Sequence, residues 1–99
     1  PYVPEGFQHS YQSFVCYIDE SKAPLSRNEI MEKLYSQGVN TRPGTIAVHM
    51  QDYYVQKYNI DPDSLPVSKD CHLHSLAIPL HNRMSPQDYK YVVSILKGI

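Results

Sequence analysis

Three polar side chains that could bind a ligand lie in a stretch of otherwise apolar and turn-forming residues, from Gly38 to Tyr54. Arg42 carries a planar guanidinium that can hold a carboxylate or a phosphate through paired hydrogen bonds. His49 can donate or accept a hydrogen bond, and Thr45 offers a hydroxyl. Each also has a structural alternative: a solvated arginine beside a turn, a histidine satisfied by a local carbonyl, and a threonine that stabilises the turn or caps a helix.

The cysteines and histidines outside this stretch do not form a metal-binding or nucleophile pattern. Cys71, His72 and His74 are close in sequence, but a zinc site needs several nitrogen or sulfur donors that converge on one point. On a helix Cys71 and His74 would share a face and His72 would not, and no second ligand pair follows at a suitable spacing. We therefore expect no metal and no cysteine nucleophile. The other histidines outside the stretch are isolated and indicate no site: His9 and His81.

The helix that precedes the ligand candidates is marked at both ends. Ser26 and Glu29 have the spacing of a capping box, which predicts a helix that begins after Ser26. Gly38 supplies the left-handed residue that commonly ends a helix. The residues expected to face the core are Ile30, Met31 and Leu34.

The other elements follow from periodicity, prolines and glycines. Strands are expected over 11–18, 39–42 and 76–80, and helices over about 47–58, 66–74 and 86–97, with Tyr89, Val92, Val93 and Leu96 as the core stripe of the last. Pro43-Gly44 fits the central positions of a type II turn. His49 would open the 47–58 helix, whose dipole favours a neutral imidazole.

These elements predict an α+β fold in one domain over residues 1–99. We expect a small antiparallel or mixed sheet of about three strands, with three or four helices packed mainly on one face. A chain of 99 residues can bury one core but cannot form a complete two-domain enzyme. Residues 1–10, with two prolines and a glycine, are expected to be an irregular connection from a preceding domain.

Composition excludes some classes of partner. The net charge of −1 does not indicate binding to nucleic acid or to a membrane surface, and no apolar run is long enough to span a bilayer. Cys16 and Cys71 are expected as free thiols of a reducing, cytoplasmic compartment. Nine tyrosines accompany two phenylalanines and no tryptophan. Most are expected at half-buried core edges, the alternative being an interface or a cleft wall.

A series of short motifs carries a resemblance to a known family. In order they are Gly38-Val39, Thr41, Arg42-Pro43-Gly44-Thr45, His49, Tyr53-Tyr54, Leu65-Pro66-Val67, Ser75-Leu76-Ala77-Ile78-Pro79-Leu80 and Met84-Ser85-Pro86. From about Tyr11 onward this order and spacing resemble the C-terminal domain of the DegT-type sugar aminotransferases, which use pyridoxal phosphate and have the fold type I architecture. Gly44 stands where many members carry a first histidine, so a two-histidine site is not supported.

The resemblance implies a role for this chain within a larger enzyme. It implies that the chain is the C-terminal small domain, which closes the substrate cleft of an upstream domain that binds pyridoxal phosphate. It also implies that the substrates are a sugar, of the nucleotide-sugar or aminocyclitol type, and an amino-acid donor, and that the whole enzyme is a homodimer. It implies that His49, with Arg42 and Thr45 as further substrate-binding candidates, faces that cleft. The chain's lysines are expected in polar turns or on solvent-exposed helix faces, where a lysine is not activated to form a Schiff base. The chain itself is therefore expected to bind no cofactor and to catalyse nothing alone. The alternative is a self-standing protein-binding or assembly module with a tyrosine-rich surface.

Overall fold

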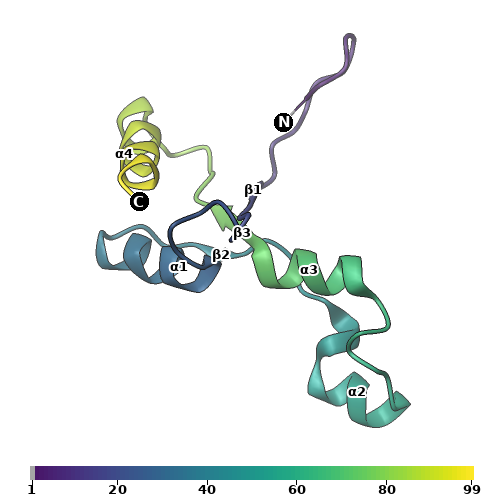
Figure 1. Cartoon of the computed structure of the whole chain (residues 1–99). Helices are drawn as coiled ribbons and strands as arrows, with labels where there is room; N and C mark the ends of the chain where they lie inside the picture. The colour runs from purple at the N-terminus through teal and green to yellow at the C-terminus, as the bar shows by residue number, and fades with distance from the viewer. Residues whose placement is uncertain (1) are drawn as a thin grey trace.

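A computed structural model describes residues 2–99 and has a three-stranded antiparallel sheet at its centre (Figure 1). The elements in chain order are β1 (Phe14–Tyr17), α1 (Arg27–Ser36), β2 (Arg42–Pro43), the 3-10 turn η1 (Val48–Met50), α2 (Asp52–Tyr58), α3 (Pro66–His74), β3 (Ser75–Ile78) and α4 (Pro86–Lys97). The strand order is β1-β3-β2, and β3 is antiparallel to both neighbours. The expected α+β fold is confirmed, with the antiparallel form of the sheet.

Helix α1 begins and ends as its sequence predicts. The Ser26 hydroxyl accepts a hydrogen bond from the Glu29 N–H, and the Glu29 carboxylate accepts one from the Ser26 N–H at 2.8 Å. At the other end Gly38 has a φ of +77°. Its N–H donates to the Tyr35 carbonyl, and the Val39 N–H donates to the Leu34 carbonyl, both at 2.9 Å. This pair of bonds is the Schellman motif that glycine permits.

The core lies between the sheet, α1 and α4. Its buried members are Ile30, Leu34, Val39, Leu76 and Val92. Leu34 of α1 and Leu76 of β3 are fully buried. Of the stripe expected on α4, Val92 and Leu96 contribute to the core as predicted, together with Ile95. The prediction was wrong for Tyr89 and Val93, which are exposed.

The chain has an extended shape for its length. Its radius of gyration is 16.0 Å, whereas a compact domain of 100 residues has about 13 Å. Figure 1 shows the N-terminal segment and α2 projecting in different directions, far from α1 and α4. All nine tyrosines are exposed, from 38% for Tyr54 to 88% for Tyr2, so the expectation of half-buried core edges was wrong. No helix within residues 2–99 is long and apolar enough to cross a bilayer.

The two capping boxes predict a loss of stability in acid. Hydrogen bonds from Ser26 lower the pKa of Glu29 from its ordinary 4.5, and hydrogen bonds from Ser85 lower that of Asp88 from 3.8. A carboxyl group whose pKa is depressed by folding contributes stability above its unfolded value and loses it as pH falls through the folded value. We expect thermal melting measured from pH 6 to pH 2 to show less acid destabilisation in the Glu29→Gln/Asp88→Asn double variant. An unchanged pH profile would contradict this account of the caps.

Candidate functional site

Pro43 and Gly44 lie alongside β3 as an extended segment and do not form the expected type II turn. Pro43 pairs with Leu76, and the Gly44 N–H donates a 2.9 Å hydrogen bond to the Ser75 carbonyl. Gly44 also lacks the positive φ that this turn requires at its third position. The strand expected over 39–42 is correspondingly shorter and shifted, because only residues from Arg42 onward pair with β3.

Glycine is required at position 44 by a close approach between strands. A Cβ placed on Gly44 would lie 2.5 Å from Val15 Cγ1 and 2.7 Å from both Ser75 Cβ and Ser75 Oγ. Real Cβ atoms do not approach other atoms this closely, so no larger side chain fits without movement of β1 or β3. The absence of a histidine at this position therefore has a steric reason in this chain.

His49 lies in η1 and does not open an α-helix. The helix expected over 47–58 is interrupted, because Gln51 has an extended backbone (φ −76°, ψ 133°) between η1 and α2. His49 is 7% exposed, and its Nε2 lies 3.1 Å from the Pro62 carbonyl oxygen. Since a carbonyl only accepts hydrogen bonds, Nε2 carries the proton, and Nδ1 of the neutral ring is left as an acceptor. The carbonyl partner comes from the loop after α2, not from the local turn.

A mostly apolar pocket surrounds His49. Its volume is about 380 Å³, and its lining comes from η1, α2, the following loop and α3: Ile46, Val48, His49, Tyr54, Ile60, Leu65 and Ser68. His49 and Ser68 are the polar side chains that could orient a ligand there, beside the Tyr54 hydroxyl. The expected assignment of His49 to a cleft wall is therefore compatible with its position.

Arg42 lines a different hollow, at the end of the sheet. The groove has a volume of about 450 Å³ and is formed by Gln12, Ser13, Asn40, Thr41, Arg42, Ala77, Ile78, Pro79, Leu80 and His81. Pairing of Arg42 with Ala77 brings these segments together. Sequence reasoning missed His81 because only the register of β2 on β3 relates it to Arg42.

Thr45 contributes its backbone, with no cap formed by its hydroxyl. Its carbonyl oxygen lies 3.3 Å from His72 Nδ1, and the Ala47 N–H lies 3.3 Å from the same nitrogen. A single nitrogen cannot donate to the first and accept from the second at once, so the tautomer of His72 selects one bond. Ala47, not Thr45, precedes η1 as its N-cap residue, and no side chain caps this turn. The three candidate residues thus lie in one segment, but Arg42 and His49 line separate hollows and Thr45 lines neither of these two.

Asp70 joins α3 to β1. The Tyr17 hydroxyl donates to Asp70 Oδ1 at 3.1 Å, and His74 Nδ1 lies 2.8 Å from the same oxygen. The hydrogen bond to the carboxylate raises the pKa of Tyr17. Within residues 2–99 no group of three or more histidine, cysteine or acidic side chains could hold a metal ion. Cys16 and Cys71 are both free thiols.

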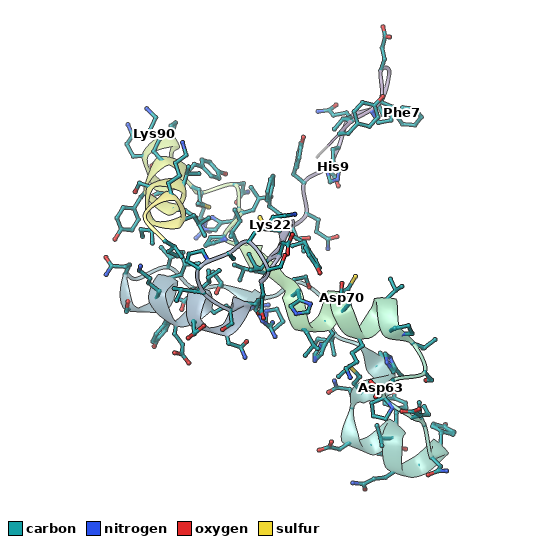
Figure 2. All side chains as sticks on the ribbon, in the orientation of Figure 1. Phe7, His9, Lys22, Asp63, Asp70 and Lys90 are labelled. Atoms are coloured by element: carbon teal, nitrogen blue, oxygen red, sulfur yellow. The ribbon has the colours of Figure 1, made fainter. Side chains whose placement is uncertain are left out.

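The lysines do not fit the requirement for a Schiff base with pyridoxal phosphate, which is a desolvated amine. Lys22 is ion-paired with Asp19 at 2.7 Å and its side chain is 81% exposed. Lys69 is ion-paired with Asp63, and the ammonium of Lys57 donates to the Tyr53 hydroxyl at 2.9 Å. The other lysines lie exposed on helices: Lys33, Lys90 and Lys97. Figure 2 shows Lys90 on the outside of α4.

Comparisons with known proteins give the family and the fold. The chain is 26% identical over its whole length to the spore coat polysaccharide biosynthesis protein SpsC of Bacillus subtilis, of which it spans 26%. Its structure is similar to that of the aminotransferase TlmJ from Streptoalloteichus hindustanus, with a TM-score of 0.79 and 26% identity over 99% of this chain and 24% of that one. An aminotransferase from Psychrobacter cryohalolentis, at 22% identity, has the same fold with a TM-score of 0.78 over 92% of this chain and 24% of its own.

These relatives are about four times as long as this chain, which corresponds to roughly a quarter of each. The family model that matches covers nearly all the described residues, from 2 to 97. The match includes the Arg42 groove, the His49 pocket and the core beneath them. The chain belongs to the DegT/DnrJ/EryC1/StrS aminotransferase family.

Proposed function

We propose that this chain is the C-terminal small domain of a cytoplasmic, pyridoxal phosphate-dependent sugar aminotransferase of the nucleotide-sugar or aminocyclitol type. In this proposal the small domain closes the substrate cleft of an upstream cofactor-binding domain, and residues 1–10 connect the two. The substrates are a sugar and an amino-acid donor, and the whole enzyme is a homodimer. This chain alone catalyses nothing.

The observation that carries the proposal is the amount of apolar surface that the chain leaves uncovered. Large apolar and aromatic side chains are exposed on the N-terminal segment and over η1, α2 and the start of α3: Tyr2, Phe7, Ile46, Val48, Tyr53, Tyr58, Leu65 and Val67. Figure 2 shows Phe7 far from the rest of the chain. Exposed apolar surface on this scale marks an interaction site. The proposed occupant is the rest of the aminotransferase, because the chain spans about a quarter of its relatives.

The substrate side of the proposal rests on the two hollows. We assign His49, through its acceptor nitrogen, to the cleft wall, with Arg42 and Thr45 as the other substrate-binding residues. Neither hollow contains a lysine. The reactive amine that holds the cofactor would therefore come from the upstream domain, and the residues of this chain would bind and orient the substrate and exclude water.

Transaminase assays test this proposal directly. The longer polypeptide that contains this chain is expected to transfer an amino group from an amino acid to a keto sugar, and residues 1–99 alone are expected to show no transfer above the buffer rate. A version of the longer polypeptide that ends before residue 1 should lose activity. Full activity of that shortened polypeptide would contradict a role in closing the cleft.

A self-standing assembly module is the second candidate, and the exposed tyrosines favour it. Tyr53, Tyr54 and Tyr58 lie together on α2, with Tyr54 and Tyr58 stacked at a ring-centroid distance of 6.3 Å. If this face binds copies of the chain, sedimentation of residues 1–99 will give a defined dimer that Tyr54→Ser/Tyr58→Ser removes. Under the aminotransferase proposal the upstream domain covers this face. The dimer contact that depends on Tyr54 and Tyr58 would then disappear once that domain is present.

A further inference from the structure

The groove beside Arg42 is built by the ends of all three strands. Pairing of Phe14 with Ile78 places the segment before β1 beside the residues that follow β3, and pairing of Arg42 with Ala77 places the segment before β2 on the other side. The groove therefore has walls from three parts of the chain that are far apart in sequence. Its polar lining cannot result from one local turn.

The lining of this groove has the chemistry of an oxyanion site. Its polar side chains are two amides, two hydroxyls, one guanidinium and one imidazole: Gln12, Asn40, Ser13, Thr41, Arg42 and His81. No carboxylate lines the groove. Within residues 2–99 the Arg42 guanidinium forms no ion pair with an acidic group. A guanidinium without a protein counterion, surrounded by neutral donors, suits the planar oxygens of a carboxylate or phosphate.

His81 has a fixed role in this arrangement because one ring nitrogen is already occupied. Its Nδ1 accepts a 3.2 Å hydrogen bond from the Arg83 N–H. In the neutral ring the proton must then lie on Nε2, which makes Nε2 a donor. The residue that sequence reasoning left unassigned thus adds a second donor suited to an anionic oxygen.

We propose that the groove binds an oxyanion, with Arg42 as the principal ligand and His81 Nε2 as a second donor. This inference deepens the proposed function by naming the chemical class that the Arg42 side of the cleft takes. The oxyanion would belong to a phosphorylated sugar or to the carboxylate of an amino-acid donor. The groove lies apart from the His49 pocket, so the two hollows would hold different parts of the substrates.

The test is an NMR titration of ¹⁵N-labelled residues 1–99 with three sodium salts at matched ionic strength: phosphate, acetate and chloride. We expect saturable shifts of the Thr41, Arg42 and His81 amides with phosphate or acetate and none with chloride. Tighter binding of phosphate would identify a phosphorylated substrate, and tighter binding of acetate a carboxylate. Shifts that do not saturate, or that chloride reproduces, would overturn the proposal.

Substitutions separate a specific site from general attraction to positive charge. Arg42→Gln should weaken binding about tenfold or more, because a hydrogen bond to a charged group is lost. The affinity of Arg42→Lys should lie between those of the unsubstituted chain and Arg42→Gln. Lysine keeps the positive charge but cannot form the paired hydrogen bonds of the planar guanidinium. His81→Ala should weaken oxyanion binding about threefold. His81→Gln should weaken it less, because glutamine keeps a hydrogen-bond donor. Lys33→Gln, on exposed α1, is the matched control.

Equal weakening by Lys33→Gln and Arg42→Gln would contradict a site at the groove. The amide spectra of the variants report whether the fold is kept, because α1 and α4 resonances should not move. The titration needs no cofactor and no second domain. Its result therefore does not depend on whether the longer polypeptide transaminates, and failure of the proposed activity would be recognised separately.

Discussion

Replacing Gly44 by alanine is expected to lower the free energy of unfolding by about 1–3 kcal/mol, the usual cost of overpacking. The added Cβ would lie 2.5 Å from Val15 Cγ1 and 2.7 Å from Ser75 Cβ. The Val15 side chain is 47% exposed and can rotate away, but Ser75 is buried in the central strand and cannot. At about 4–8 °C per kcal/mol for a domain of 60–100 residues, calorimetry should detect the change clearly.

Gly98→Ala is the matched control for this substitution. A Cβ at Gly98 would lie 3.5 Å from the Ile95 carbonyl oxygen, which is an ordinary contact. The change in stability should stay within about 0.5 kcal/mol. Adding Val15→Ala to Gly44→Ala should restore only part of the loss, because the contact with Ser75 remains. Complete restoration would show that Ser75 on β3 can move aside, and would contradict a rigid approach of β2 to β3.

Replacing His49 by alanine is expected to destabilise the region of η1 and α2 by about 1–3 kcal/mol, because the Pro62 carbonyl loses its donor. The sequence predicted His49 at the start of a helix, facing a cleft. The side chain is 7% exposed and joins η1 to the loop after α2. Because α2 packs mainly on η1, the opening should be local and visible as faster amide hydrogen exchange in α2.

The variant His49→Gln separates packing from substrate binding. A glutamine amide can donate to the Pro62 carbonyl, so protection of α2 should largely return. With that amide nitrogen at the Nε2 position, the glutamine carbonyl oxygen does not occupy the Nδ1 position, so the acceptor there is lost. In the longer polypeptide both variants should therefore lose about twofold to tenfold in kcat/KM, the worth of one hydrogen bond. Recovery of both protection and activity in His49→Gln would leave His49 a structural residue. His9→Ala, on the N-terminal arm in Figure 2, is the control.

The elements with local signals were predicted well from the sequence. Helix α1 follows Ser26 and ends before Gly38 because its caps are made by nearby residues. Helix α3 spans Pro66–His74 as expected, since proline at a first position both permits and marks a helix start. The pattern of β1, with Phe14 and Cys16 more buried than their neighbours, also agrees with the alternation in the sequence.

The region of the candidate site was predicted poorly, because distant residues determine it. Pro43-Gly44 has the composition of a turn, but pairing with β3, more than thirty positions later in sequence, extends it as a strand. The backbone at Gln51 breaks the expected helix, and His49 turns inward toward Pro62. His81 joined the Arg42 groove only through strand register. No local pattern contains this information.

The central claim is that this chain serves an aminotransferase whose cofactor is held elsewhere in the polypeptide, and borohydride trapping tests it most directly. The longer polypeptide and residues 1–99 would each be mixed with pyridoxal phosphate, reduced, digested and mapped by mass spectrometry. We predict one stoichiometric cofactor-modified lysine in the longer polypeptide, outside residues 1–99, and no specific modification of the chain alone. Specific, stoichiometric modification of any lysine within residues 1–99 would contradict the claim.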